Sequence, residues 1–194
     1  KKYFNVTEDP ALADLAIVFV KSPDGGVGYS REDREKGGNG YVPISLQYGP
    51  YVATTAREKS IAAGDPVIDP SITNRSYKGK ETTSSNVTDL KSILDTKAAM
   101  KGKPVVVVIN GNEPMVFAEF EKETDGILYG FGVMDQAVMD VLSGRFEPSG
   151  LLPVQMPANM ETVEQQLEDV PHDMKVYVDS EGNAYDFGYG LNWK

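Results

Sequence analysis

KPVVVVINGNEP, residues 103–114, is the stretch that decides the fold. Its run of five β-branched residues at positions 105–109 predicts a strand. Because no polar residue interrupts the run, we expect this strand to be buried on both faces, as strands of parallel sheets are. The segment LADLAIVFV, residues 12–20, ends in a similar apolar run and predicts a second buried strand.

Patterns typical of helices alternate with the strands. Residues 84–100 predict a helix that Ser85 or Asn86 can cap, with an apolar face formed by Val87, Leu90, Ile93, Leu94 and Ala98. Beyond the central strand we predict a short helical stretch at 115–120, a strand at 125–131, a helix at 133–144, a short strand at 151–157, a polar helix at 161–170 and a hairpin at 175–185. This alternation predicts a single α/β domain over residues 1–194, a three-layer sandwich with a mainly parallel sheet and helices on both faces.

A long irregular insertion follows the first strand, at about residues 21–85. It is rich in glycine and proline, with short strands predicted around residues 41–48 and 51–56. An insertion of this length inside a compact domain is usually functional or forms an interface. Ligands of parallel α/β sheets bind beyond the carboxyl ends of the strands. Because the insertion starts at such an end, it is a candidate binding site.

Charge and residue types exclude several functions. A net charge of −10, with 29 acidic and 19 basic residues, argues against nucleic acid or an anionic membrane as a partner. No apolar run approaches the ~20 residues of a membrane span. The chain has no cysteine and a single histidine, His172, so thiolate and multi-histidine metal sites are excluded. Since the glycines at 25–28 match no phosphate-binding loop, a nucleotide-binding domain is disfavoured, and we predict neither a cofactor nor a metal.

Carboxylates gather in the first part of the insertion, KSPDGGVGYSREDREKGGNGY, residues 21–41. They are Asp24, Glu32, Asp33 and Glu35, interleaved with basic side chains. One interpretation is a solvated loop whose charges neutralise one another. The other is that one carboxylate is a general acid whose pKa is tuned by burial or by a nearby charge. The residues alone leave both interpretations open.

Three blocks of the second half resemble a known family. They are KPVVVVINGNEPMVFAEF at 103–120, DGILYGFGVMDQAVMDVLSGRFEPSGLLPVQMP at 125–157 and YDFGYGLNW at 185–193. Together with LADLAIVFV they stand in the order found in the C-terminal domain of glycoside hydrolase family 3. PSGLLPVQMP followed by FGYGL is the most specific part of this resemblance.

The resemblance implies the second domain of a retaining, exo-acting β-glucosidase or β-xylosidase. In that family an N-terminal (β/α)8 barrel carries the aspartate nucleophile, and the loop after the first strand of the second domain commonly supplies the acid/base glutamate. The implied partners are therefore the barrel of the same parent chain and a β-linked gluco- or xylo-oligosaccharide. The chain contains no barrel and does not begin with Met, so we expect a fragment that is inactive alone.

The family's loop motif, GEGxDR, is altered in this chain. The matching segment is GVGYSR at residues 26–31, where Val27 replaces the glutamate. Because valine cannot transfer a proton, the family's acid/base does not carry over at this position. The nearby Glu32 or, second, Asp33 is the predicted replacement.

The same loop supplies the predicted substrate contacts, Asp24 and Tyr29. Two other roles stay open for the domain as a whole. The long insertion could reach across a homodimer interface. Alternatively, the domain is a non-catalytic sugar-binding or assembly module that kept the scaffold and lost the acid.

Overall fold

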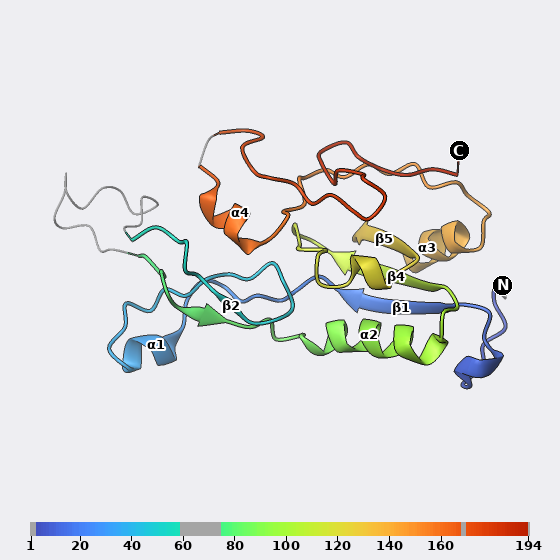
Figure 1. Cartoon of the computed structure of the whole chain (residues 1–194), viewed down its shortest axis with the longest axis horizontal. Helices are drawn as coiled ribbons and strands as arrows, with labels where there is room; N and C mark the ends of the chain where they lie inside the picture. Colours follow the sequence, from blue (N-terminus) through green and yellow to red (C-terminus); the bar gives the residue numbers. More distant parts are fainter. Residues whose placement is uncertain (1–2, 59–74, 168–169, 194) are drawn as a thin grey trace.

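The computed structural model describes residues 3–58, 75–167 and 170–193, and its centre is a parallel three-stranded sheet (Figure 1). The strands, in spatial order, are β1 (Ala16–Lys21), β4 (Val105–Gly111) and β5 (Gly126–Phe131). The register pairs Ala16 with Val105 and Val106 with Gly126. The α/β class and the parallel sheet predicted from the apolar runs are confirmed.

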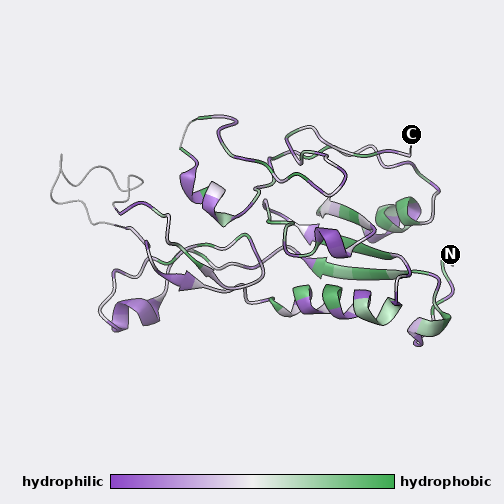
Figure 2. Ribbon diagram, in the orientation of Figure 1, coloured by the Kyte–Doolittle hydropathy of each residue, from purple (hydrophilic) through white to green (hydrophobic). Residues whose placement is uncertain are grey.

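β4 occupies the middle of the sheet because its side chains tolerate burial on both faces. Val105, Val107 and Ile109 are fully buried, whereas Phe19 on the outer strand β1 is 63% exposed. The continuous apolar run that predicted a buried strand therefore marks the central strand. Figure 2 shows hydrophobic residues along the strands and hydrophilic residues on the short helix of the insertion at residues 31–35.

Helix α2 (Thr88–Met100) packs along β1 and β4 on one face of the sheet, where Ile93 is fully buried. The predicted cap by Ser85 or Asn86 is wrong. The N-cap position is Val87, and no side chain caps the helix there. The amide of Asn86 instead donates to the backbone oxygen of Ser22 and to the carboxylate of Asp89, so it joins the helix start to the end of β1.

The face opposite α2 carries less helix than the three-layer prediction requires. Figure 1 shows α3 (Asp135–Leu142) beside β5, whereas the C-terminal segments contribute Met156 and Tyr177 to the core cluster that contains Ile93 of α2. The buried ring of Phe117 packs against Tyr129, Tyr177 and Tyr185, with ring centroids 5.2–6.3 Å apart. These rings belong to the same core cluster as Ile93 of α2, so aromatic packing extends the layer on the α2 side of the sheet.

Several smaller elements differ from their predictions. The predicted helical stretch at 115–120 consists of turns followed by η2 (Glu121–Glu123), and the predicted strand at 151–157 is irregular apart from a bridge between Pro157 and Val176. The polar helix is present as α4 (Met160–Gln165), and a bridge between Val178 and Ala184 closes the predicted hairpin. A short 3-10 helix, η1 (Pro10–Leu12), precedes β1.

The described part of the insertion extends away from the central sheet (Figure 1). It contains a helix that was not predicted, α1 (Arg31–Glu35), and a two-stranded antiparallel sheet of β2 (Tyr51–Val52) and β3 (Glu81–Thr82). β2 confirms a strand in the predicted region 51–56, while the region 41–48 forms only a bridge between Tyr41 and Tyr29. In the described part of the chain, no helix is both long and apolar enough to cross a membrane.

Candidate functional site

The loops after β1 and β4 meet at the carboxyl edge of the parallel sheet, where ligands of such sheets bind. The backbone amide of Ser22 donates to the backbone oxygen of Asn110 at 3.2 Å. The hydroxyl of Ser22 lies 3.4 Å from the side-chain oxygen of Asn112. These contacts hold the start of the insertion against the turn that follows β4.

The glycine-rich part of the insertion folds back on itself. Backbone hydrogen bonds join Ser30 to Gly40 at 2.8 Å and Ser45 to Gly25 at 3.4 Å. A Cβ atom on Gly25 would lie 1.9 Å from the backbone oxygen of Ser45, so only glycine allows this approach. The predicted loop is therefore an ordered pair of antiparallel segments, and its glycines serve backbone packing.

Asp24 is fixed at the root of this loop, next to the start of α2. Its backbone amide donates to the side-chain oxygen of Asn86 at 2.7 Å, and its carboxylate accepts from the hydroxyl of Ser85 at 2.6 Å. The residue is exposed and belongs to the carboxyl edge of the sheet. This position suits its predicted role as a contact to a ligand at that edge.

Glu32 lies on α1, in the outer part of the insertion. Its carboxylate forms an ion pair with Lys36 at 2.6 Å, and its side chain is 75% exposed. The hydrogen bond and the charge of Lys36 hold the pKa of Glu32 below its ordinary value. A general acid must carry a proton at the working pH, so this pairing works against the predicted role.

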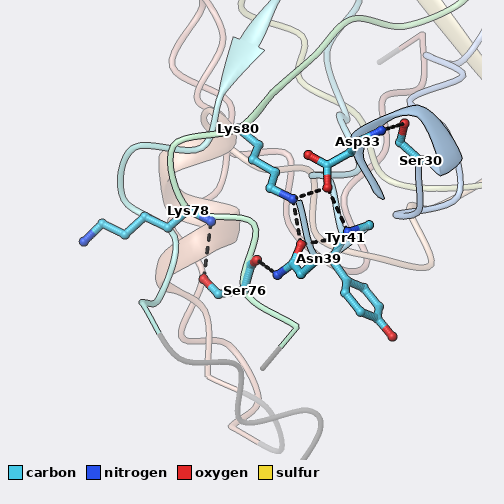
Figure 3. A network of polar contacts seen from close by, with 8 residues as sticks. Ser30, Asp33, Asn39, Tyr41, Ser76, Lys78 and Lys80 are labelled. Atoms are coloured by element: carbon cyan, nitrogen blue, oxygen red, sulfur yellow. Dashed lines mark hydrogen bonds and ion pairs between the residues drawn. The ribbon is translucent and has the colours of Figure 1, made fainter. Parts of the chain in front are cut away.

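Asp33 forms the centre of a polar network inside the insertion (Figure 3). Its Oδ2 accepts from Lys80 Nζ at 2.6 Å and from the backbone amide of Gly40 at 2.8 Å. Lys80 also donates to the side-chain oxygen of Asn39 at 2.6 Å. The hydrogen bond from Lys80, followed by that from Gly40, lowers the pKa of Asp33. Asp33 is therefore held ionised and acts as a structural anchor for the two ends of the insertion.

Tyr29 and Val27 present their side chains on the surface of the loop. Tyr29 is 44% exposed, and its ring meets that of Tyr41 edge-to-face with centroids 5.8 Å apart. The role of Tyr29 as a substrate contact stays a prediction. Val27, where the resemblance leads us to expect the acid/base, is 86% exposed. The structure thus brings together Asp24, Tyr29 and Val27 on one loop and places Glu32 and Asp33 farther out, on α1.

Sequence reasoning did not single out Glu113, which lies in the turn after β4. Its side chain is half-buried, and burial followed by the charge of Asp24 raises its pKa. The hydroxyl of Tyr129 donates to the backbone oxygen of Glu113 at 2.5 Å and fixes its position. The available signal was the turn NGNEP directly after the central strand, at the ligand edge of the sheet.

No cluster of metal ligands accompanies these residues. Over residues 3–58, 75–167 and 170–193, no three His, Cys, Asp or Glu side chains are grouped so that they could hold a metal ion.

The comparison with known families decides what kind of domain this is. Residues 2–193 match the Glycosyl hydrolase family 3 C-terminal domain. The chain belongs to this family. In full enzymes of the family this domain normally pairs with an N-terminal barrel.

Individual relatives of this family 3 domain are glycosidases. The chain is 34% identical over 104 residues to "Probable beta-glucosidase C" of Aspergillus flavus, an alignment that covers 51% of this chain and 16% of that protein. It is 28% identical over 126 residues to the "Periplasmic beta-glucosidase" of Salmonella typhimurium, covering 56% of this chain and 16% of that protein. The chain therefore spans about one sixth of the length of these relatives.

A solved structure is also similar to the family 3 domain. The structure of beta-glucosidase 3B from Thermotoga neapolitana in complex with glucose matches with 20% identity and a TM-score of 0.43. The match covers 96% of this chain and 35% of that chain.

Proposed function

We propose that this domain completes the sugar site of a retaining, exo-acting β-glycosidase, a β-glucosidase or β-xylosidase, together with an N-terminal barrel of the same parent chain. The observation that carries the proposal is the family match over residues 2–193. The barrel supplies the carboxylate nucleophile, and the carboxyl edge of the sheet faces the sugar. A β-linked gluco- or xylo-oligosaccharide is the substrate.

The loop after β1 supports this role through its position and its exposed groups. Asp24 supplies a carboxylate that can accept hydrogen bonds from sugar hydroxyls, and Tyr29 supplies an exposed ring. Both lie on an ordered backbone, so little flexibility is lost when a ligand binds. Glu32 and Asp33 stay candidates for the acid/base by their place in the sequence, although their lysine partners favour the ionised form.

The proposal is tested by joining the domain to a family 3 barrel and measuring hydrolysis of aryl β-glucosides and aryl β-xylosides. We expect turnover by the two-domain protein and none by the isolated domain, because without a nucleophile there is no covalent pathway. A well-folded two-domain protein that hydrolyses neither class of substrate would overturn the proposal.

One observation favours a second candidate, a non-catalytic sugar-binding or assembly domain. Val27 stands where the family resemblance leads us to expect the acid/base, and its exposed side chain has no ionisable group. Such a domain would bind a glucoside in calorimetry without accelerating its hydrolysis in the presence of a barrel. A homodimer formed through the extended insertion stays a prediction that the sedimentation velocity of the two-domain protein can check.

A further inference from the structure

Glu113 is distinguished by its position at the sheet edge, by the fixed turn that carries it, and by a carboxyl group that no described side chain binds. It lies directly beyond the carboxyl end of the central strand β4, whose register pairs Asn110 with Lys21 at the end of β1. The loop after β1 is the one in which family members commonly place the proton donor. Glu113 therefore stands one strand away from the altered motif, at the same edge of the sheet.

The turn that carries Glu113 is rigidly positioned. The hydroxyl of Tyr129 reaches across from β5 to the backbone oxygen of Glu113 at 2.5 Å. A Cβ atom on Gly111 would lie only 1.9 Å from the hydroxyl oxygen of Tyr129. The glycine thus makes room for the bond, and β4 and β5 together fix the glutamate at the sheet edge. Fixed geometry of this kind is what a catalytic group requires.

The carboxyl group of Glu113 is not committed to a structural contact. Within the described residues, it has neither a hydrogen-bond donor nor an ion-pair partner, whereas Lys36 binds Glu32 and Lys80 binds Asp33. The ionisable groups that act on it are Asp24, in the loop after β1, and Tyr129, on β5. Burial and the negative charge of Asp24 both favour its protonated form.

We propose that Glu113 is the proton donor that takes over from the glutamate missing at Val27; this inference rests on the proposed glycosidase function. In the first step the Glu113 carboxyl gives its proton to the glycosidic oxygen. The bond from that oxygen to the anomeric carbon breaks, and the leaving alcohol departs neutral. At the same time the barrel's carboxylate nucleophile forms a bond to the anomeric carbon.

In the second step Glu113 acts in the opposite direction. Its carboxylate takes a proton from a water molecule, whose oxygen attacks the anomeric carbon and displaces the nucleophile. The sugar leaves with the configuration retained, and Glu113 is protonated again. Both steps need a carboxyl group whose pKa lies near the working pH, which the lysine-paired Glu32 and Asp33 do not provide.

The test uses the two-domain protein, with the variant Glu113→Gln and the matched control Glu123→Gln. Glu123 is an exposed glutamate on η2.

Two substrates are compared: an alkyl β-glucoside, whose leaving group needs a proton, and dinitrophenyl β-glucoside, whose leaving group departs without one. We expect Glu113→Gln to lower kcat/KM for the alkyl glucoside about 10²–10⁴-fold and to affect the dinitrophenyl substrate far less. Azide should then raise turnover of the dinitrophenyl substrate by replacing the unactivated water. Glu123→Gln should match the unchanged protein.

A second variant, Asp24→Asn, tests the same inference without altering Glu113. The charge of Asp24 favours protonation of Glu113, so its removal should move the alkaline limb of the kcat/KM profile to lower pH. Equal losses on both substrates in Glu113→Gln, or no loss, overturn the inference and leave the proposed function standing. If Glu113→Gln does not fold, an alkaline limb that stays in place in Asp24→Asn overturns it. An unchanged two-domain protein that hydrolyses neither substrate overturns the proposed function itself.

Discussion

The ammonium nitrogen of Lys80 lies 2.6 Å from Oδ2 of Asp33, and this ion pair joins the first helix of the insertion to the residue just before β3. Both side chains are only about one-fifth exposed, at 23% and 22%. Solvent therefore screens this pair less than the neighbouring pair of Lys36 and Glu32, whose side chains are 74% and 75% exposed. The Lys80–Asp33 pair is one of the contacts that join the two described segments of the insertion, on either side of residues 59–74.

Replacing Lys80 with methionine should raise the pKa of Asp33 toward its ordinary value, because the first cause of the depression is the hydrogen bond from Lys80. The backbone amide of Gly40 donates to the same carboxylate oxygen, so its proton chemical shift reports the titration. We expect the midpoint followed by NMR to move upward in Lys80→Met. The control Lys36→Met should leave it in place, and an equal shift in both variants would contradict the assignment.

Stability should depend on pH through the same pair. The folded-state pKa of Asp33 lies below the unfolded value of about 3.9. Its contribution is therefore fully present above about pH 4 and is lost as the pH falls through the folded-state pKa. Urea unfolding between about pH 5 and pH 2 should show a steeper loss of stability for the unchanged protein than for Lys80→Met. Parallel curves would show that the pair contributes nothing to folding.

Glycine is required at position 25 because the backbone of Ser45 approaches it too closely for a side chain. Gly25→Ala should therefore lower the free energy of unfolding by more than about 1 kcal/mol. The added Cβ would fall 1.9 Å from a backbone oxygen, and neither partner can move without breaking the antiparallel contact. Gly150→Ala is the matched control, because nothing lies within 4 Å of its Cβ position. Thermal unfolding of both variants checks the difference, and similar melting temperatures would argue against this packing.

The sequence predicted those parts of the fold whose apolar residues are stable only when they are buried. The apolar run at 105–109 can only be satisfied by burial, and it became the central strand β4. The apolar face of α2 was predicted only in part, since Ile93 is buried but Leu94 and Ala98 are exposed. The strand predicted at residues 151–157 was wrong, because their apolar side chains pack against the core without a continuous strand partner.

The candidate site was harder to predict than the sheet, because it depends on contacts between distant segments. Glu32 and Asp33 were sensible candidates by sequence position, but only the structure shows that Lys36 and Lys80 bind them. Lys80 is 47 residues from Asp33, and no local pattern links the two. Glu113 was missed for the converse reason: it is half-buried without a side-chain partner among the described residues, and a sequence does not display that.

The last prediction concerns Phe117, which holds the C-terminal part of the chain onto the sheet. Its ring is 1% exposed and contacts the rings of Tyr129, from β5, and of Tyr185, from the C-terminal segment. Phe117→Ala removes both contacts and leaves a cavity, so we expect a loss of about 3–5 kcal/mol in the free energy of unfolding. Phe146→Ala is the control, because that side chain is 65% exposed and its loss should cost little. Urea denaturation measures both variants. If they lose the same free energy, the aromatic cluster is not what holds the C-terminal segment onto the sheet.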